Sequence, residues 1–363
     1  MSDIGNVEEY INYLNFHGGT TEEGHFIRNV GEIVHDFLFF IHSRYSYMGP
    51  SLELLIRASP KNNAQARIDN KIIINRGIID LFVPHEATTS EVKYTEFLSL
   101  SQEQRVQRLG GLLWVVAHEF FHFARGHHRV RATSKLMAQA LEFDADCYAI
   151  AGTYRYFLDH MQAEQSRADI KNIVCKSFYF GIRELIEIND IKRDEEKSHP
   201  RWAVRLRAAH DKLANLDIPL VNFGLTQQFI DEYNILFDEM VKFERDFLVR
   251  NGVQSVKESK FLVGEYVDGV PSPEYSKLLA EWERIEPLVW SVSNLFADKF
   301  IHGKPFLVSG EGRTTCFSRG IQYTSESVNW WLRPMFHMQS SSSNMQVGYS
   351  ARVIIPNAYW VPR

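Results

Sequence analysis

Apolar residues recur every three or four positions through most of the chain, which is the spacing of amphipathic helices. Ser101 and Gln104 stand at the start of one such segment, three residues apart as in a capping box. Pro200 stands where the first turn of a helix tolerates proline. The pattern predicts helices over residues 23–48, 101–127, 133–160, 167–188, 200–215, 225–250 and 274–302.

Two segments break the helical pattern. Residues 51–58 and 67–83 are rich in Ile and Leu and are interrupted by proline, asparagine and glycine, which predicts two to four short strands. Residues 303–363 are poor in helical period and rich in Ser, Gly, Trp and Tyr, which is typical of irregular structure. The fold class we expect is α+β, mainly helical with a small antiparallel sheet and a helical and irregular C-terminal region.

Composition narrows the classes of partner. The 363 residues suffice for one large domain or two modest ones. With 40 basic and 45 acidic side chains, the formal charge of -5 gives no electrostatic reason to expect binding to nucleic acid or to an anionic membrane. The longest uncharged apolar run, Leu109–Ala117, is far shorter than the roughly 20 residues that span a bilayer. We therefore expect neither nucleic acid nor membrane insertion.

Cysteine content and the first residues indicate the compartment. The three cysteines, Cys147, Cys175 and Cys316, form no CxxC pair, so the sequence predicts neither a disulfide framework nor a thiolate zinc site. The N-terminus lacks the basic start and apolar stretch of a secretory signal. A cytoplasmic location is the expectation.

The sequence contains the motif HExxH at His118-Glu119-Phe120-Phe121-His122. Two histidines four residues apart project from one helical face, so both imidazoles reach one metal ion. Glu119 lies about 100° round the helix from His118, beside the position where a metal-bound water would sit. The preceding run, Leu112–Ala117, is apolar, and buried histidines without a metal would be costly to satisfy. We therefore predict His118 and His122 as metal ligands and Glu119 as general base.

A third ligand is expected on the next helix. Glu142 and Asp146 are four residues apart and share a face, so Glu142 can complete a His/His/Glu site. Asp146 can then accept a hydrogen bond from a ligand imidazole and fix its tautomer. The alternative is that both carboxylates belong to an exposed acidic face.

His128 is a competing third ligand, as in the pattern HExxHxxGxxH. That pattern needs glycine at position 125, whereas this chain has Arg125 and places Gly126 one residue later. We therefore favour Glu142 and expect His127 and His128 to cap the end of the helix.

These motifs resemble those of known metallopeptidases. HExxH followed by Gly126-His127, then ExxxD at 142–146 and His199-Pro200-Arg201, resembles the gluzincins, in particular the HtpX and CAAX-prenyl endopeptidase family. The match covers about residues 65–210. Only twenty residues separate His122 from Glu142, so the chain is similar to a soluble relative of that family and also to Lit-like phage-exclusion peptidases, cytosolic HExxH enzymes that act on a folded host protein.

The resemblance implies a zincin-like metallopeptidase core over residues 1–220 and leaves 221–363 as an aromatic-rich region of unknown role. It implies that His199 or Arg205 lies across the cleft and stabilises the oxyanion of a tetrahedral intermediate, a place that requires a cationic or hydrogen-bonding group. Each also has an ordinary interpretation, His199 as a helix cap and Arg205 as a solvated arginine. Tyr148 and Tyr179 are further candidates.

The function we predict is that of a zinc-dependent endopeptidase acting on a peptide or on one specific protein. One Zn²⁺ per chain would lower the pKa of its bound water towards about 7, and Glu119 would take the proton. The same ligands can hold other divalent ions. An extended substrate would pair with a strand edge within residues 67–83, at Ile73 or Ile74. The alternative is a non-hydrolytic zinc-bearing module that binds a partner through its aromatic C-terminal region. The oligomeric state stays open.

Overall fold

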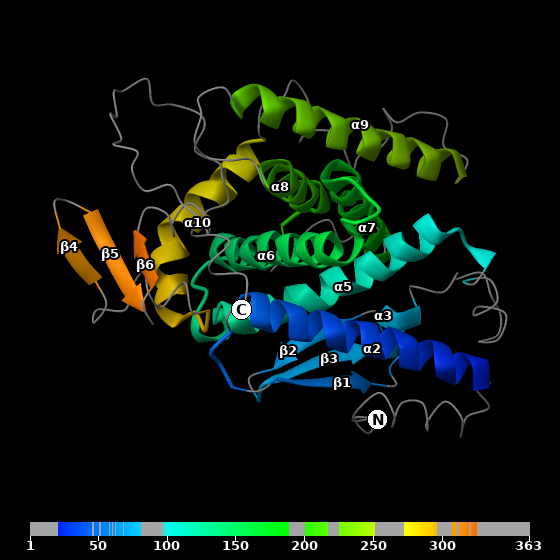
Figure 1. The fold of residues 1–363 in the computed structure, drawn as a ribbon, viewed down its shortest axis with the longest axis horizontal. Coiled ribbons are helices and arrows are strands. Elements are labelled where there is room, and N and C mark those ends of the chain that lie inside the picture. The colour runs from blue at the N-terminus through cyan, green and yellow to red at the C-terminus, as the bar shows by residue number, and fades with distance from the viewer. Residues whose placement is uncertain are drawn as a thin grey trace.

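The computed structural model describes residues 21–80 except 46, 51, 58, 60, 62 and 68, and then residues 97, 99–188, 200–216, 225–250, 272–295, 307–310, 313–318 and 321–324. Over these residues the fold is mostly helical with a small mixed sheet (Figure 1). The expected α+β class is confirmed.

Each predicted helix corresponds to one in the structure: α2 (Thr21–Arg44), α5 (Gln102–Ala124), α6 (Lys135–Met161), α7 (Arg167–Ile188), α8 (Trp202–Asn215), α9 (Leu225–Arg250) and α10 (Pro273–Val292). Two short elements, α3 (Arg76–Asp80) and the 3₁₀ helix η1 (His127–Arg129), complete the described helices. The capping box of α5 is confirmed, since Ser101 Oγ accepts the Gln104 N–H and Gln104 Oε1 accepts the Ser101 N–H.

The sheet contains β1 (Glu53–Arg57), β3 (Lys71–Asn75) and β2 (Ala64–Arg67), in that spatial order. β2 is antiparallel to β3, but β1 is parallel to it, so the prediction of an antiparallel sheet is wrong for one of the two pairings. The reason is topological: β2 returns to β3 through a tight turn, whereas β1 lies on the far side of β3. Ile73 and Ile74 are therefore buried in the central strand, and the edge strands are β1 and β2.

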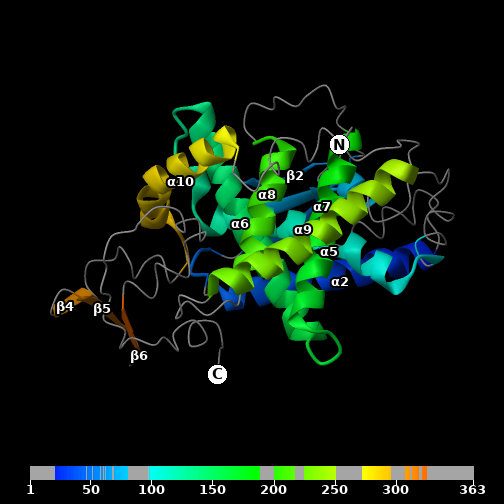
Figure 2. The ribbon, with the colours of Figure 1, turned by 90° about the horizontal axis from the view of Figure 1, so that it is seen from above.

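The helices are layered above this sheet (Figure 1). α5 lies nearest the sheet, α6 and α7 both pack on α5, α8 packs on α6 and α7, and α9 is outermost, on α7 and α8. Seen from above, α9 runs across α7 and α8 (Figure 2). α5 therefore runs through the middle of the described fold.

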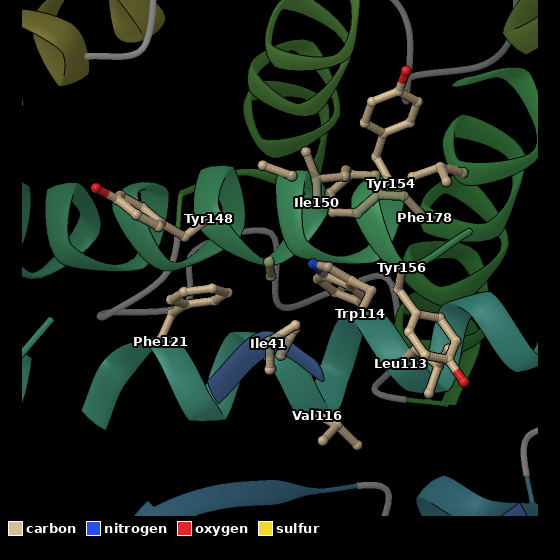
Figure 3. Packing of buried hydrophobic residues seen from close by; sticks show 14 of the residues in the cluster. Ile41, Leu113, Trp114, Val116, Phe121, Tyr148, Ile150, Tyr154, Tyr156 and Phe178 are labelled. Atoms are coloured by element: carbon tan, nitrogen blue, oxygen red, sulfur yellow. The ribbon is translucent and has the colours of Figure 1, made fainter. Parts of the chain in front are cut away.

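Apolar contacts hold α5 between the sheet and α6. Figure 3 shows Trp114 and Phe121 of α5 on the side of α6, where Phe121 meets the ring of Tyr148 with centroids 5.1 Å apart. Val116 points away from α6 towards the strands, and Ile41 of α2 lies beside α5. All five side chains are buried, so the helix that carries HExxH has a fixed orientation.

The described helices beyond residue 221 pack on those before it. α9 contacts α7 and α8, and α10 contacts α6 and η1. α10 ends at Val292, ten residues before the predicted end, because the chain then turns back to α5. There the Asn294 N–H donates to the Ala124 carbonyl at 2.7 Å and Asn294 Nδ2 donates to the Phe123 carbonyl at 3.2 Å, which caps the C-terminal end of α5.

The region predicted to be irregular contains a second, antiparallel sheet of β4 (Leu307–Gly310), β5 (Arg313–Ser318) and β6 (Ile321–Thr324). These strands have four to six residues, too few to give a clear period in the sequence. No described helix is both long enough and apolar enough to cross a bilayer.

Candidate metal centre

Three side chains of α5 and α6 converge on one point. His118 Nε2 lies 3.0 Å from His122 Nε2 and 3.1 Å from Glu142 Oε2, and His122 Nε2 lies 3.4 Å from the same oxygen. Among the described residues, these three form a group of ligand atoms close enough to hold one metal ion.

The spacing of this group fits a tetrahedral metal. Ligand atoms at about 2.0–2.2 Å from a tetrahedral zinc ion are separated by about 3.3–3.6 Å, so the observed separations of 3.0, 3.1 and 3.4 Å would have to widen by only a few tenths of an ångström. The side chains of His122 and Glu142 are 18% and 15% exposed, so solvent reaches the point of convergence. Two imidazoles and one carboxylate are also a common donor set for zinc.

The local field favours a cation at His118. Burial alone would lower the pKa of His118, but the carboxylates of Asp146 and Glu142 outweigh it and raise this pKa to about 10. Without a metal, a proton is therefore held on the imidazole. A divalent cation would satisfy the same two carboxylates.

His118 is supported by Asp146 and Arg205. Asp146 Oδ1 lies 2.9 Å from His118 Nδ1, and Arg205 of α8 donates from Nε to Asp146 Oδ2 at 2.6 Å and from Nη2 to Oδ1 at 2.9 Å. Burial would raise the pKa of Asp146, but Arg205 and His118 hold it well below its usual range. The Arg205 guanidinium also lies over the rings of Trp114 and Trp202. Arg205 is thus on the Nδ1 side of His118, behind the point of convergence.

His122 is supported through another histidine. His127 Nδ1 lies 2.9 Å from His122 Nδ1, and His127 Nε2 lies 2.9 Å from Asp144 Oδ2. Arg125 Nε donates to the same oxygen of Asp144 at 2.7 Å. Burial lowers the pKa of His127 to about 4 although Asp144 opposes this, so the ring is neutral at physiological pH. The expectation that His127 caps the helix is wrong, because its ring contacts these side chains instead.

Gly126 makes this arrangement possible. Its φ of 69° and ψ of 27° are left-handed, which lets the chain turn sharply from α5 into η1 and bring His127 back to His122. A Cβ at this position would lie 2.4 Å from the Val292 carbonyl oxygen. His128 is exposed, and its ring packs on Phe123 with centroids 5.1 Å apart. It lies outside the group that could hold a metal.

Asp144 and Arg125 are functional residues that were not predicted from the sequence. Asp144 is two residues from Glu142 and from Asp146, so it lies about 200° round α6 from each and off the face they share. The available signal was Gly126 directly before His127, since glycine at a helix end indicates a left-handed turn.

Glu119 lies between α5 and the sheet. Its Oε2 accepts the backbone N–H of Ala66, in the edge strand β2, at 2.6 Å. The carboxylate is half-buried and stands one residue from His118. The strand thus anchors one of its two oxygens.

Two predicted tyrosines belong to the core. Tyr148 is buried, and the Arg125 guanidinium lies over its ring, 4.7 Å from the centroid of that ring. The Tyr179 hydroxyl accepts a hydrogen bond from Arg183 Nε, and its ring packs on Phe243 of α9. His199 lies outside the described residues.

A family model described as Peptidase U49 matches residues 101–218, the stretch from α5 to α8. No curated protein and no solved structure matches the chain. The matched stretch carries every residue of the converging group and of its two supports. This part of the chain is therefore similar to a peptidase family, and the similarity supports a proteolytic function.

Proposed function

We propose that the chain is a zinc-dependent endopeptidase of the gluzincin type, a soluble relative of the HtpX and Lit-like peptidases. The observation that supports this most is the convergence of His118, His122 and Glu142 in a segment similar to a peptidase family. A zinc ion held by these residues would supply an acidified water and polarise the peptide carbonyl.

Glu119 is the general base in this proposal. Because its Oε2 accepts the Ala66 N–H, Oε1 is the oxygen that takes the proton from the attacking water. Glu119 then returns this proton to the leaving amine. Arg205 acts through Asp146, which orients His118, and we assign it this role in place of the oxyanion role that the resemblance implies. An oxyanion role for His199 stays a prediction.

The substrate class is a polypeptide. β2 is an edge strand, and its Ala66 reaches Glu119, so an extended substrate paired with β2 would lie beside the metal ligands. By the two-residue period of a strand, the Ala64 N–H faces the same edge as that of Ala66. Ala64→Pro should keep zinc binding and weaken cleavage, and unchanged cleavage would count against pairing at this edge.

The test compares the zinc content and proteolysis of four proteins: wild type, Glu142→Ala, Glu119→Gln and, as a control, Glu103→Gln. Glu103 is on the same helix and 60% exposed, so its loss should change little. We expect one zinc per chain in all except Glu142→Ala. New protein termini in a whole-cell lysate should appear with wild type and Glu103→Gln only.

Two results would contradict the proposal. One is a wild-type chain that binds no zinc when zinc is supplied, and the other is undiminished cleavage by Glu119→Gln. Zinc binding without new termini in any sample would favour the non-hydrolytic module instead. A single cut in the lysate together with intact casein would indicate one specific protein substrate.

A further inference from the structure

We propose that His127 is a positioning residue that fixes the tautomer of His122, so that the lone pair of His122 Nε2 faces the metal position. The proposal rests on the metal site of the proposed function. It assigns a role to a histidine that is outside the ligand group and within hydrogen-bonding distance of a ligand ring.

Counting hydrogens along the contacts leads to this assignment. An ionised carboxylate only accepts hydrogen bonds, so the contact between Asp144 Oδ2 and His127 Nε2 places a hydrogen on that nitrogen. Arg125 already neutralises Asp144, and a second proton on the buried His127 would add an uncompensated charge. His127 Nδ1 is then an acceptor.

The remaining contact joins two nitrogens. His127 Nδ1 and His122 Nδ1 are 2.9 Å apart, and one hydrogen must lie between them. Since His127 Nδ1 accepts, His122 Nδ1 donates, and a His122 ring that carries one hydrogen uses it there. Its Nε2 is left with a lone pair, which is the form that binds a metal. The opposite tautomer would place a hydrogen where the metal binds.

The fold fixes the position of His127 on two sides. The left-handed Gly126 turns the chain at the end of α5, and the Val292 carbonyl of α10 closes against this turn. The Arg125 guanidinium lies 5.7 Å from the ring centroid of Trp282 in α10, and Arg125 Nε in turn donates a hydrogen bond to Asp144. A ring that only filled space would need neither the carboxylate nor the arginine.

The test uses His127→Phe, His127→Gln and the control His128→Phe. Phenylalanine keeps a ring but cannot accept the hydrogen of His122. Glutamine can accept from His122 through Oε1 and donate to Asp144 through Nε2, so it should rescue. His128→Phe changes the next residue of η1, whose exposed ring packs on Phe123 and does not reach Asp144.

Two measurements separate positioning from general stability. The first is the tautomer of His122 in chelator-treated protein, from ¹⁵N spectra of labelled histidine rings assigned by single substitutions. We expect the Nδ1–H form in wild type, His127→Gln and His128→Phe, and its loss in His127→Phe. The second is zinc affinity by chelator competition, which should fall about 10–100-fold in His127→Phe alone.

An unchanged His122 tautomer in His127→Phe would overturn the proposal, as would equal loss of zinc affinity in His127→Phe and His128→Phe. A wild-type chain that binds no zinc would overturn the proposed function, and the His122 tautomer in that same sample would still decide the role of His127.

Discussion

The two histidines of HExxH lie on the same face of α5, yet they are supported differently. His118 meets a carboxylate directly, at Asp146, whereas His122 reaches Asp144 only through the ring of His127. Both carboxylates come from α6 and both are buried, so His118 and His122 each depend on a buried negative charge.

Each carboxylate is neutralised by an arginine from a different part of the chain. Arg205 comes from α8, whereas Arg125 comes from the end of α5 and lies beside Trp282 of α10. We call Asp146 and Arg205 the direct support of His118, and His127, Asp144 and Arg125 the relayed support of His122. The direct support depends on the packing of α8 on α6, and the relayed support depends on the turn at Gly126 and on α10. Support through a second ring needs more elements of the fold in place. It also specifies which nitrogen of each histidine ring carries the hydrogen.

The largest expected effect is that of removing Arg205. Arg205→Met leaves Asp146 buried without the two hydrogen bonds of the guanidinium, and breaking a buried pair in this way destabilises proteins by about 3–5 kcal/mol. Each carboxylate keeps a histidine partner, His118 for Asp146 and His127 for Asp144, so the difference lies in the arginines. Arg125→Met should destabilise less, because Arg125 bonds Asp144 through Nε, whereas Arg205 bonds Asp146 through both Nε and Nη2. Urea unfolding of the zinc-free variants measures both free energies.

The double variant Asp146→Leu with Arg205→Met is the control for this comparison. Replacing both partners with apolar residues removes the uncompensated charge, so stability should return in part. Zinc affinity should stay low, because His118 has still lost its partner. If Arg125→Met proved the more destabilising single variant, the order of the two supports would be reversed.

The next effect compares the carboxylates themselves. Asp146→Asn should lower zinc affinity by about 10–100-fold, because it changes the group that holds a ligand ring directly. Asp144→Asn should lower it by about tenfold, at the lower end of that range, since His127 still lies between the change and His122. Chelator competition measures both. A larger loss in Asp144→Asn would mean that the relayed contact is the more important one.

The direct support is also the one that the sequence made visible. Glu142 and Asp146 share a face through their spacing of four, and His118 and His122 do so on the preceding helix. These relations lie within single helices, so periodicity was enough to predict them. The helices themselves were predictable for the same reason, since long amphipathic stripes give a strong signal.

The relayed support depends on relations between elements. Asp144 points away from the shared face of α6, and only the crossing of α5 and α6 brings it to Arg125. The early end of α10 is similar, because Ser293 and Asn294 leave the helix to bond with the Ala124 carbonyl. The parallel pairing of β1 with β3 is likewise a matter of strand order. No local pattern carries this information.

Gly126→Ala should break the relayed support alone. A left-handed backbone costs a non-glycine residue about 1–2 kcal/mol, and the added Cβ would also displace the Val292 carbonyl. We expect a modest loss of stability in urea unfolding and a loss of zinc affinity as His127 moves. Glu103→Gln, at an exposed position of α5, is the comparison for zinc affinity. Unchanged zinc binding in Gly126→Ala would show that the turn does not position His127.

The smallest expected effect is that of His210, which does not contact the direct support but lies on the same helix as Arg205. His210 is on α8, the helix that carries Arg205, and its Nε2 donates to the Tyr233 carbonyl of α9 at 2.8 Å. Burial lowers the pKa of His210 to about 3. The unfolded chain takes up this proton at about pH 6.5 and the folded chain does not, so stability is complete above that pH and declines as pH falls.

Between about pH 6.5 and pH 5.5 this decline should amount to about 1 kcal/mol. His210→Phe should remove that part of the pH dependence, whereas His35→Phe, at an exposed position of α2, should keep it. Urea unfolding at the two pH values measures the difference for each protein. If protonation of His210 at low pH loosens the packing of α8, Arg205 should hold Asp146 less firmly. Zinc affinity should then fall more steeply with decreasing pH in Asp144→Asn, which relies on the direct support, than in Asp146→Asn. Equal pH responses in these two variants would mean that α8 holds Arg205 in place without His210.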